Sequence, residues 1–285
     1  MPNRSFFIFL QSLFRIEERK KLVSVLKICS VRSSSKGNAT LIYDGEAAIL
    51  ADCGVSGKIL DEALCEAGIE PALIKGIVVT HEHTDHTKGI GVVSRKYGIP
   101  VFATYGTWTA MQKAVGAIAS ENKRIFDESL SFDIGGIRVS PFSIPHDAAQ
   151  PVGFTFEKDG EKVAVATDIG VMTNEIFERI KGSRVVLLES NYDLFMLEAG
   201  TYPYDLKCRI KGDCGHLCND DAALVVKDLV SNGTKEIILG HLSQENNYPD
   251  LAFETTKLCL LSHGIRVGED VELYVAKRDG IVMSK

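Results

Sequence analysis

The segment Thr80–His86, with the sequence Thr-His-Glu-His-Thr-Asp-His, constrains this chain more than any other stretch. It directly follows a short apolar run at residues 74–79, which predicts a buried strand. Imidazole nitrogens and carboxylate oxygens are the ligands that suit zinc and similar divalent ions. A polar loop that only caps a helix needs one such residue and not four. The segment therefore predicts a metal site at the end of a strand.

The spacing of the four candidate ligands within this segment suggests two sets. On an extended backbone, His81, His83 and Asp85 would share one face because side chains alternate. His86 would turn away from that face as the chain enters the next helix. One short loop would then offer ligands to two adjacent metal ions.

The composition is that of an ordinary globular protein, with 45% hydrophobic and 25% charged residues. No run of 18 apolar residues occurs, so no membrane-spanning helix and no stable membrane insertion are expected. The net charge of −6 argues against broad nonspecific attraction to nucleic acid, but not against a polyanion held by bound metals. The seven cysteines have no secreted-domain spacing, which favours reduced thiols in a cytoplasm.

The N-terminus lacks the longer apolar core and the small-residue cleavage site of a signal peptide. We expect residues 1–23 to form an extension outside the fold, as a loose amphipathic helix, with a membrane-surface anchor as the alternative. No linker rich in Gly, Ser or Pro divides the remainder. Residues 24–285 are therefore expected to form one domain.

Strand and helix patterns come in clusters through both halves of the chain, which favours an α/β fold of two sheets packed face to face with helices outside. The predicted strands lie at 22–31, 39–43, 47–51, 74–79, 101–103, 136–142, 152–157, 161–166, 184–188, 236–239 and 271–275. The predicted helices lie at 56–67, 87–97, 105–119, 173–181, 220–231 and 249–263.

Four further strand ends carry an acid or a histidine, where catalytic loops belong. These residues are His146, Asp168, Glu189 and His241. Any one of them alone is more often a cap or a satisfied polar group. Together with the segment 80–86 they indicate a functional site.

The pattern His-x-His-x-Asp-His after an apolar strand resembles the signature of the metallo-β-lactamase superfamily, and the resemblance extends over roughly residues 25–277. It implies a four-layer αββα sandwich that holds one or two metal ions. The ligands it implies are His81, His83 and His146 for the first metal, Asp85, His86 and His241 for the second, and Asp168 as a bridge. Class B lactamases have a cysteine at the bridging position, so the acid favours a dinuclear site and argues against β-lactam hydrolysis.

The expected cofactors are two divalent metal ions, and both zinc and manganese suit nitrogen and oxygen ligands. Two such ions lower the pKa of water and stabilise both oxygens of an in-line displacement. Phosphodiester and thioester hydrolysis would both use this chemistry. A thioester or ester hydrolase of the glyoxalase II type is the alternative function, although the chain after His241 is too short for that enzyme's helical domain.

Two features favour the phosphodiester. Glu189 and His216 resemble the acid and histidine pair of ribonuclease Z and the β-CASP nucleases, in which a charged imidazole acts as a general acid. The segment Gly240–Ser243 resembles the motif of the same branches that contains the distal ligand histidine. We therefore assign Asp85, Glu189 and His216 to the catalytic group.

Further pieces resemble the YycJ/WalJ group of bacterial metallohydrolases, among them Ser35–Asn38, Ala166–Gly170 and Leu188–Asn191. This likeness implies a DNA exonuclease that acts from the 5′ end. The chain departs from the group at Ser33-Ser34-Ser35, where Ser-Gly-Ser is usual, and at Tyr192 and Cys218, where His and Ser are usual.

Substrate contacts are expected from Lys207 and Arg209 in the basic run before His216, and from Ser243. Cationic side chains near a nuclease site position phosphates. A solvated surface turn explains the basic run equally well.

Overall fold

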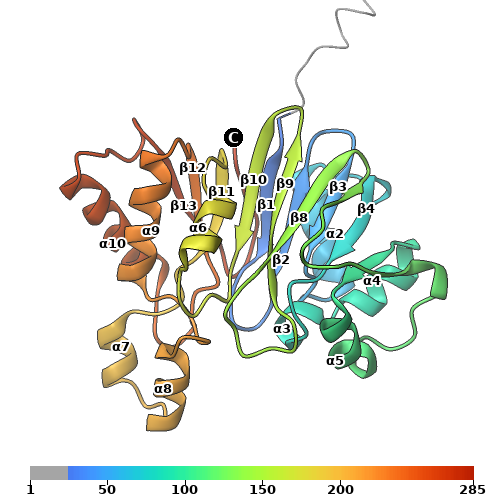
Figure 1. The fold of residues 1–285 in the computed structure, drawn as a ribbon, viewed down its shortest axis with the longest axis horizontal. Helices are drawn as coiled ribbons and strands as arrows, with labels where there is room; N and C mark the ends of the chain where they lie inside the picture. Colours follow the sequence, from blue (N-terminus) through green and yellow to red (C-terminus); the bar gives the residue numbers. More distant parts are fainter. Residues whose placement is uncertain (1–24) are drawn as a thin grey trace, which may run out of the picture.

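The computed structural model describes residues 25–285, so the expected extension at 1–23 lies outside the described residues. Two seven-stranded sheets pack face to face, and helices cover both outer faces (Figure 1). The predicted four-layer α/β sandwich is confirmed. None of the helices in the described part of the chain has both the length and the apolar character needed to cross a bilayer.

The first sheet contains most of the N-terminal strands. Its order is β14 (Val282–Met283), β1 (Lys27–Arg32), β2 (Ala39–Tyr43), β3 (Ala48–Ala51), β4 (Ile74–Val78), β5 (Val101–Ala103) and β6 (Lys123–Ile125). Strands β3 to β6 run parallel to one another.

The second sheet contains the strands of the C-terminal half. Its order is β13 (Glu272–Val275), β12 (Glu236–Gly240), β11 (Val185–Glu189), β10 (Glu161–Ala166), β9 (Val152–Lys158), β8 (Ile137–Ser143) and β7 (Phe132–Ile134). Strands β10 to β13 run parallel. Each sheet therefore combines an antiparallel part with a parallel part, and loops at the carboxyl ends of parallel strands are where such folds bind ligands.

Three helices cover each outer face. The first sheet is covered by α2 (Gly57–Ala67), α4 (Ile90–Tyr97) and α5 (Tyr105–Val115), and the second by α6 (Asn174–Ile180), α9 (Asn219–Ser231) and α10 (Pro249–Ser262). The other α-helices of the described residues are α3 (Thr84–Thr87), α7 (Leu194–Ala199) and α8 (Tyr204–Lys211). The last two lie together at the lower left of Figure 1, beyond the ends of the strands.

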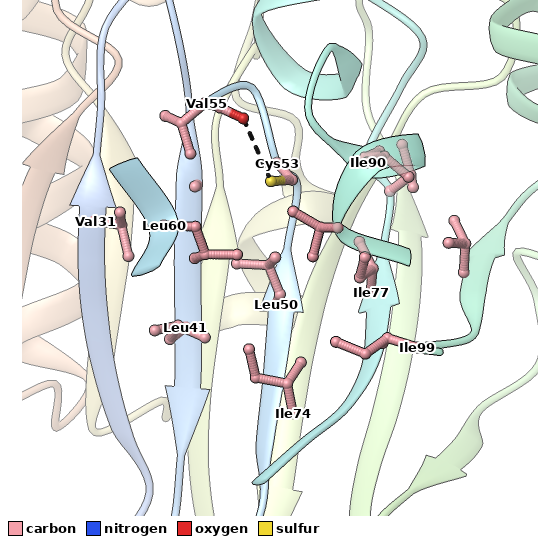
Figure 2. Close-up of a cluster of buried hydrophobic side chains, with 14 of the residues drawn as sticks. Val31, Leu41, Leu50, Cys53, Val55, Leu60, Ile74, Ile77, Ile90 and Ile99 are labelled. Atoms are coloured by element: carbon pink, nitrogen blue, oxygen red, sulfur yellow. Dashed lines mark hydrogen bonds between the residues drawn. The ribbon is translucent and has the colours of Figure 1, made fainter. Parts of the chain in front are cut away.

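Three apolar clusters fill the spaces between the layers. Figure 2 shows the cluster between the first sheet and its helices, in which Leu41 and Leu50 meet Leu60 of α2 and Ile90 of α4. A second cluster lies between the sheets, and a third under α6, α9 and α10. Burying one such side chain contributes about 1.5–3 kcal/mol. The sandwich therefore provides a rigid base for the loops at its edge.

In helix α2 the local sequence determines where the helix begins, which face is buried and where it ends. Ser56 is its N-cap, and the Ser56 hydroxyl accepts a hydrogen bond from the Ile59 amide. Leu60, Ala63 and Leu64 form its buried face. Gly68 ends the helix in the left-handed conformation at φ 67°, which glycine adopts without steric cost.

The structure differs from the predicted elements where sequence signals are weak. The predicted helix at 87–97 is two helices, α3 and α4, divided at Lys88 and Gly89. The predicted helix at 105–119 ends at Val115, because Gly116 has φ 72°. Strands β6 and β7 and helices α7 and α8 were not predicted, since all are short and α8 buries no residue.

Gly54 allows the turn after β3 to pack against the loop that contains Asp85, one of the predicted ligands. A Cβ atom at Gly54 would lie 1.5 Å from the Asp85 carbonyl oxygen and 2.8 Å from the Asn38 nitrogen. We expect Gly54→Ala to lower the free energy of unfolding by about 2–3 kcal/mol, because the backbone must shift. Urea denaturation measures the change.

The matched control for this change is Gly57→Ala in the first turn of α2. A Cβ there would meet only Val92 Cγ1, at 3.6 Å, so stability should stay equal or rise. Equal stability of the Gly54 and Gly57 variants would contradict the prediction.

Candidate metal centre

His81, His83 and His146 converge at one end of the sandwich. The first two follow β4, and His146 follows β8. The His81 ring centroid lies 4.5 Å from that of His83 and 4.9 Å from that of His146, and His146 Nε2 lies 3.3 Å from His83 Nδ1. One ring nitrogen from each lies within 4.8 Å of the others. The three imidazoles expected to share a cation are therefore brought together.

Asp85, His86 and His241 form a second group, again with ligand atoms within 4.8 Å of one another. Asp85 Oδ2 lies 3.4 Å from His86 Nε2 and 3.5 Å from His241 Nε2. The extended backbone expected through Asp85 ends at His83, because α3 begins at Thr84. A helical turn, not strand alternation, therefore directs both Asp85 and His86 into this group.

Asp168 lies between the two groups. Its Oδ2 is 3.4 Å from His86 Nε2, and its Oδ1 is 3.7 Å from His146 Nε2 and 3.5 Å from His241 Nδ1. The residue follows β10 with φ 60°, a conformation that is uncommon outside glycine. The carboxylate therefore lies near residues of both groups, where the family resemblance implies a bridging acid.

Three buried polar atoms at this centre lack a hydrogen-bond partner among the described residues: His81 Nε2, Asp168 Oδ2 and His241 Nε2. An unpaired buried polar group costs about 1–3 kcal/mol. The three atoms belong to the two imidazole groups and to the carboxylate between them. Their donor types and their convergence fit divalent cations.

Asp52 and Thr80 contact the Nδ1 atoms of His86 and His81 and so orient their rings. Asp52 Oδ2 lies 2.8 Å from His86 Nδ1 and also accepts the Thr80 hydroxyl at 2.8 Å. Thr80 Oγ1 lies 3.0 Å from His81 Nδ1. Such bonds fix the tautomer, so that Nε2 of each ring faces the centre. Sequence reasoning missed Asp52, although it follows the apolar strand β3 just as Asp168 follows β10.

Glu189 is fully buried at the end of β11 and accepts four hydrogen bonds. Its Oε1 lies 2.8 Å from Nδ1 of both His216 and His241, and its Oε2 accepts the amides of Ile169 at 2.9 Å and Leu217 at 3.1 Å. The expected pair with His216 is present, and the contact with His241 was not foreseen. Glu189 therefore joins three loops at one point.

The charges of this network shift the pKa values of its members. Burial opposes ionisation of Glu189, but the His216 charge and hydrogen bond outweigh it and lower the Glu189 pKa to about 2. Burial likewise opposes the charged imidazole of His216, whereas Glu189 raises the His216 pKa above its usual value. Asp85 has a pKa far below its usual value, since bonds to His241 and His86 outweigh burial.

The centre opens into a cavity of about 250 Å³, the metal pocket. His83, Asp85, His146, Asp168, His216 and His241 line its floor. Tyr202 and the α8 residues Leu206, Arg209 and Ile210 form a wall above the floor. Helices α7 and α8, which the sequence did not reveal, thus shape the approach to the centre.

The three expected substrate contacts divide between two places. Arg209 and Ser243 line the metal pocket, where Arg209 Nε bonds Asp147 Oδ2 at 2.5 Å. Lys207 does not line it, because its ammonium group donates to the Glu198 carbonyl oxygen of α7 at 2.6 Å. Successive residues of a helix point in different directions, so a basic run could not show which cation faces the site.

Comparison with known proteins identifies relatives whose similarity extends over most of this chain. A family model described as a β-lactamase superfamily domain matches residues 48–241. Exodeoxyribonuclease YycJ of Bacillus anthracis is 40% identical over 242 residues, which span 85% of this chain and 92% of that protein. Exodeoxyribonuclease WalJ of Streptococcus pneumoniae is 36% identical over 255 residues, spanning 89% and 95%.

The solved structures agree on the fold. The metallo-β-lactamase fold protein YhfI from Bacillus subtilis superposes with a TM-score of 0.66 at 13% identity, over 90% of this chain and 99% of that one. Together with the sequence matches, this accounts for both the sandwich and the strand-end clusters of histidine and aspartate, which bind divalent metal in this fold. Because the matches extend over most of both proteins, the chain belongs to the metallo-β-lactamase superfamily of hydrolases, in the group of YycJ and WalJ.

Proposed function

We propose that the chain is a dinuclear metal-dependent phosphodiesterase that degrades DNA as a 5′-to-3′ exonuclease. The observation that carries this proposal is the pair of ligand groups on either side of Asp168, with the Glu189–His216 pair at their edge. The relatives named exodeoxyribonuclease support DNA as the substrate. The 5′-to-3′ direction rests on the sequence resemblance. The seven unpaired thiols are in keeping with a cytoplasmic location.

The metal ions, zinc or manganese, would be held by seven side chains. His81, His83 and His146 would hold the first, Asp85, His86 and His241 the second, and Asp168 both. When bound, divalent ions lower the pKa of water to near neutrality and stabilise negative charge on phosphoryl oxygens.

The remaining steps belong to the chain's own groups. Asp85, with 24% of its side chain exposed, lies in the metal pocket and can orient an incoming water. His216 has 21% of its side chain exposed, and Glu189 holds its Nδ1, which leaves Nε2 free to give a proton to the departing oxygen. Arg209 would exchange its bond with Asp147 for a substrate phosphate, because guanidinium binds phosphate in a bidentate manner.

The metal content tests the ligand assignment. We expect two divalent ions per wild-type chain, and about one in each of His83→Ala and Asp85→Ala, because each removes a ligand from a different group. Mass spectrometry of the metals in purified protein provides the number. A wild-type content of one ion, with loss only in the His83 variant, would contradict the dinuclear site.

The role of His216 can be separated from metal binding. His216→Ala should keep two ions and lower kcat for phosphodiester cleavage by about 10²–10⁴-fold, the usual contribution of a general acid. Metal content and kcat are measured on the same preparation. His263→Ala is the matched control, because that imidazole bonds only its own helix end. Loss of metal from the His216 variant would instead make His216 a ligand.

Substrate and direction require a panel of labelled DNA. We expect release of mononucleotides from 5′-labelled strands at early times, while 3′-labelled strands shorten progressively, and no activity after chelation until Zn²⁺ or Mn²⁺ is restored. The measurement is gel electrophoresis of single- and double-stranded substrates. Turnover of S-lactoylglutathione, with none on DNA or bis-p-nitrophenyl phosphate, would favour the thioester hydrolase instead.

A further inference from the structure

A second hollow, of about 390 Å³, lies next to the metal pocket, and its lining is strongly cationic. Arg32, Lys36, Lys88 and Arg278 line it, and Asp279 is the one acid among its lining residues. We call it the basic pocket. The chain as a whole has a net charge of −6, so the positive charge of this pocket is opposite in sign to the net charge of the protein. Such a lining favours the binding of an anionic ligand.

Among the described residues, only Arg32 of the four cations pairs with a carboxylate. Arg32 pairs with Asp279 and also donates to the Arg278 carbonyl oxygen at 2.7 Å. The Lys88 ammonium donates to the Lys36 carbonyl oxygen at 2.6 Å. Lys36 and Arg278 are both exposed, and within residues 25–285 neither forms an ion pair with a carboxylate. Their charges remain available to a ligand.

Two short backbone segments separate the basic pocket from the metal pocket, and each contributes residues to both. Ser35 lines the metal pocket, whereas its neighbours Ser34 and Lys36 line the basic pocket. In the second segment, Ser243 lines the metal pocket and Gln244 lines the basic pocket. Successive Cα atoms are about 3.8 Å apart, so one extended ligand can reach both pockets.

The turn between the pockets is held in place by backbone contacts. Gly37 N donates to the Ser34 carbonyl oxygen at 3.0 Å, and Gly54 N donates to that of Asn38 at 2.6 Å. Asn38 N donates to the Asp85 carbonyl oxygen at 2.7 Å, and Asn38 Nδ2 donates to Asp85 Oδ2 at 3.2 Å. The wall of the basic pocket is therefore fixed directly to a proposed metal ligand.

We propose that the basic pocket binds the phosphate backbone of the nucleic-acid strand beyond the bond being cut, with Lys36 and Arg278 each contacting a phosphate. This inference rests on the proposed nuclease function and adds a second binding site to it. Each strand of a B-form duplex carries one phosphate per about 3.4 Å of axis, so a strand that passes over Ser35 would bring its next phosphates to the basic pocket. Substrates too short to reach it gain nothing from it.

The test is a double variant, Lys36→Gln with Arg278→Gln, in the metal-loaded protein. Binding of a fluorescent single-stranded oligonucleotide with cleavage-resistant phosphorothioate linkages is measured by anisotropy over a range of salt concentrations. We expect the affinity to fall about 10-fold and the slope of log K against log salt to shrink by about 1.4, because each phosphate contact on a single strand contributes about 0.7. The rate on bis-p-nitrophenyl phosphate, which has no further phosphates, should not change.

The matched control is Lys257→Gln with Arg266→Gln, which removes the same charge at α10 and just beyond it, on the far left of Figure 1. Its oligonucleotide affinity and salt slope should equal those of the wild type. Equal affinity and slope in the Lys36 and Arg278 variant, at unchanged metal content, would overturn the basic pocket. Failure of the wild type to cut either DNA or bis-p-nitrophenyl phosphate would overturn the nuclease, while the binding measurement would still decide the pocket.

Discussion

The centre depends on one buried carboxylate. Glu189 has no exposed surface, and an isolated charge in that position would be strongly destabilising. Its two oxygens instead accept from two imidazoles and two backbone amides, which come from the loops after β10, before α9 and after β12. These bonds keep Glu189 ionised, and the ionised group in turn sets the direction of His216 and His241. Removing the charge would therefore release three loops at once, not a single side chain.

Backbone strain accumulates at the same edge of the sandwich. Asp52, Asp168 and His241 each follow a strand and have φ between 55° and 60°, in the left-handed region. Such conformations cost about 1–3 kcal/mol each and persist only where the surroundings determine them. Here the neighbouring strands are fully paired on both sides and packed against the apolar clusters. The stable interior thus holds chain reversals that bring Asp52, Asp168 and His241 from both sheets to the candidate metal centre.

The sequence predicted the interior well because apolar runs have a strong period. The strands at 161–166 and 236–239, and the acid or histidine at the end of each, were predicted from the apolar runs, whereas the ligand roles came from the family resemblance. Asp52 carried the same signal after β3, but its contacts with His86 and Thr80 are tertiary and could not be read from the sequence. Helices α7 and α8 could not be predicted in this way, since both are short and their apolar contact is a small cluster that contains Leu197 and against which Ile210 packs. The direction of a side chain on an exposed helix is a tertiary property.

The turn Ser33–Asn38 lies between the candidate metal centre and the basic pocket and is hydrogen-bonded to residues of the centre. Its Ser33 hydroxyl accepts from the His241 amide at 2.7 Å, and its Asn38 bonds Asp85. A phosphate held by Lys36 would therefore pull on a segment that is bonded to residues of the second ligand group. These contacts combine the short side chains of Ser33 and Asn38 with one backbone bond, in which Asn38 N donates to the Asp85 carbonyl oxygen. If the chain acts as the proposed nuclease, substrate length and the geometry of the proposed second metal group would be coupled through this turn.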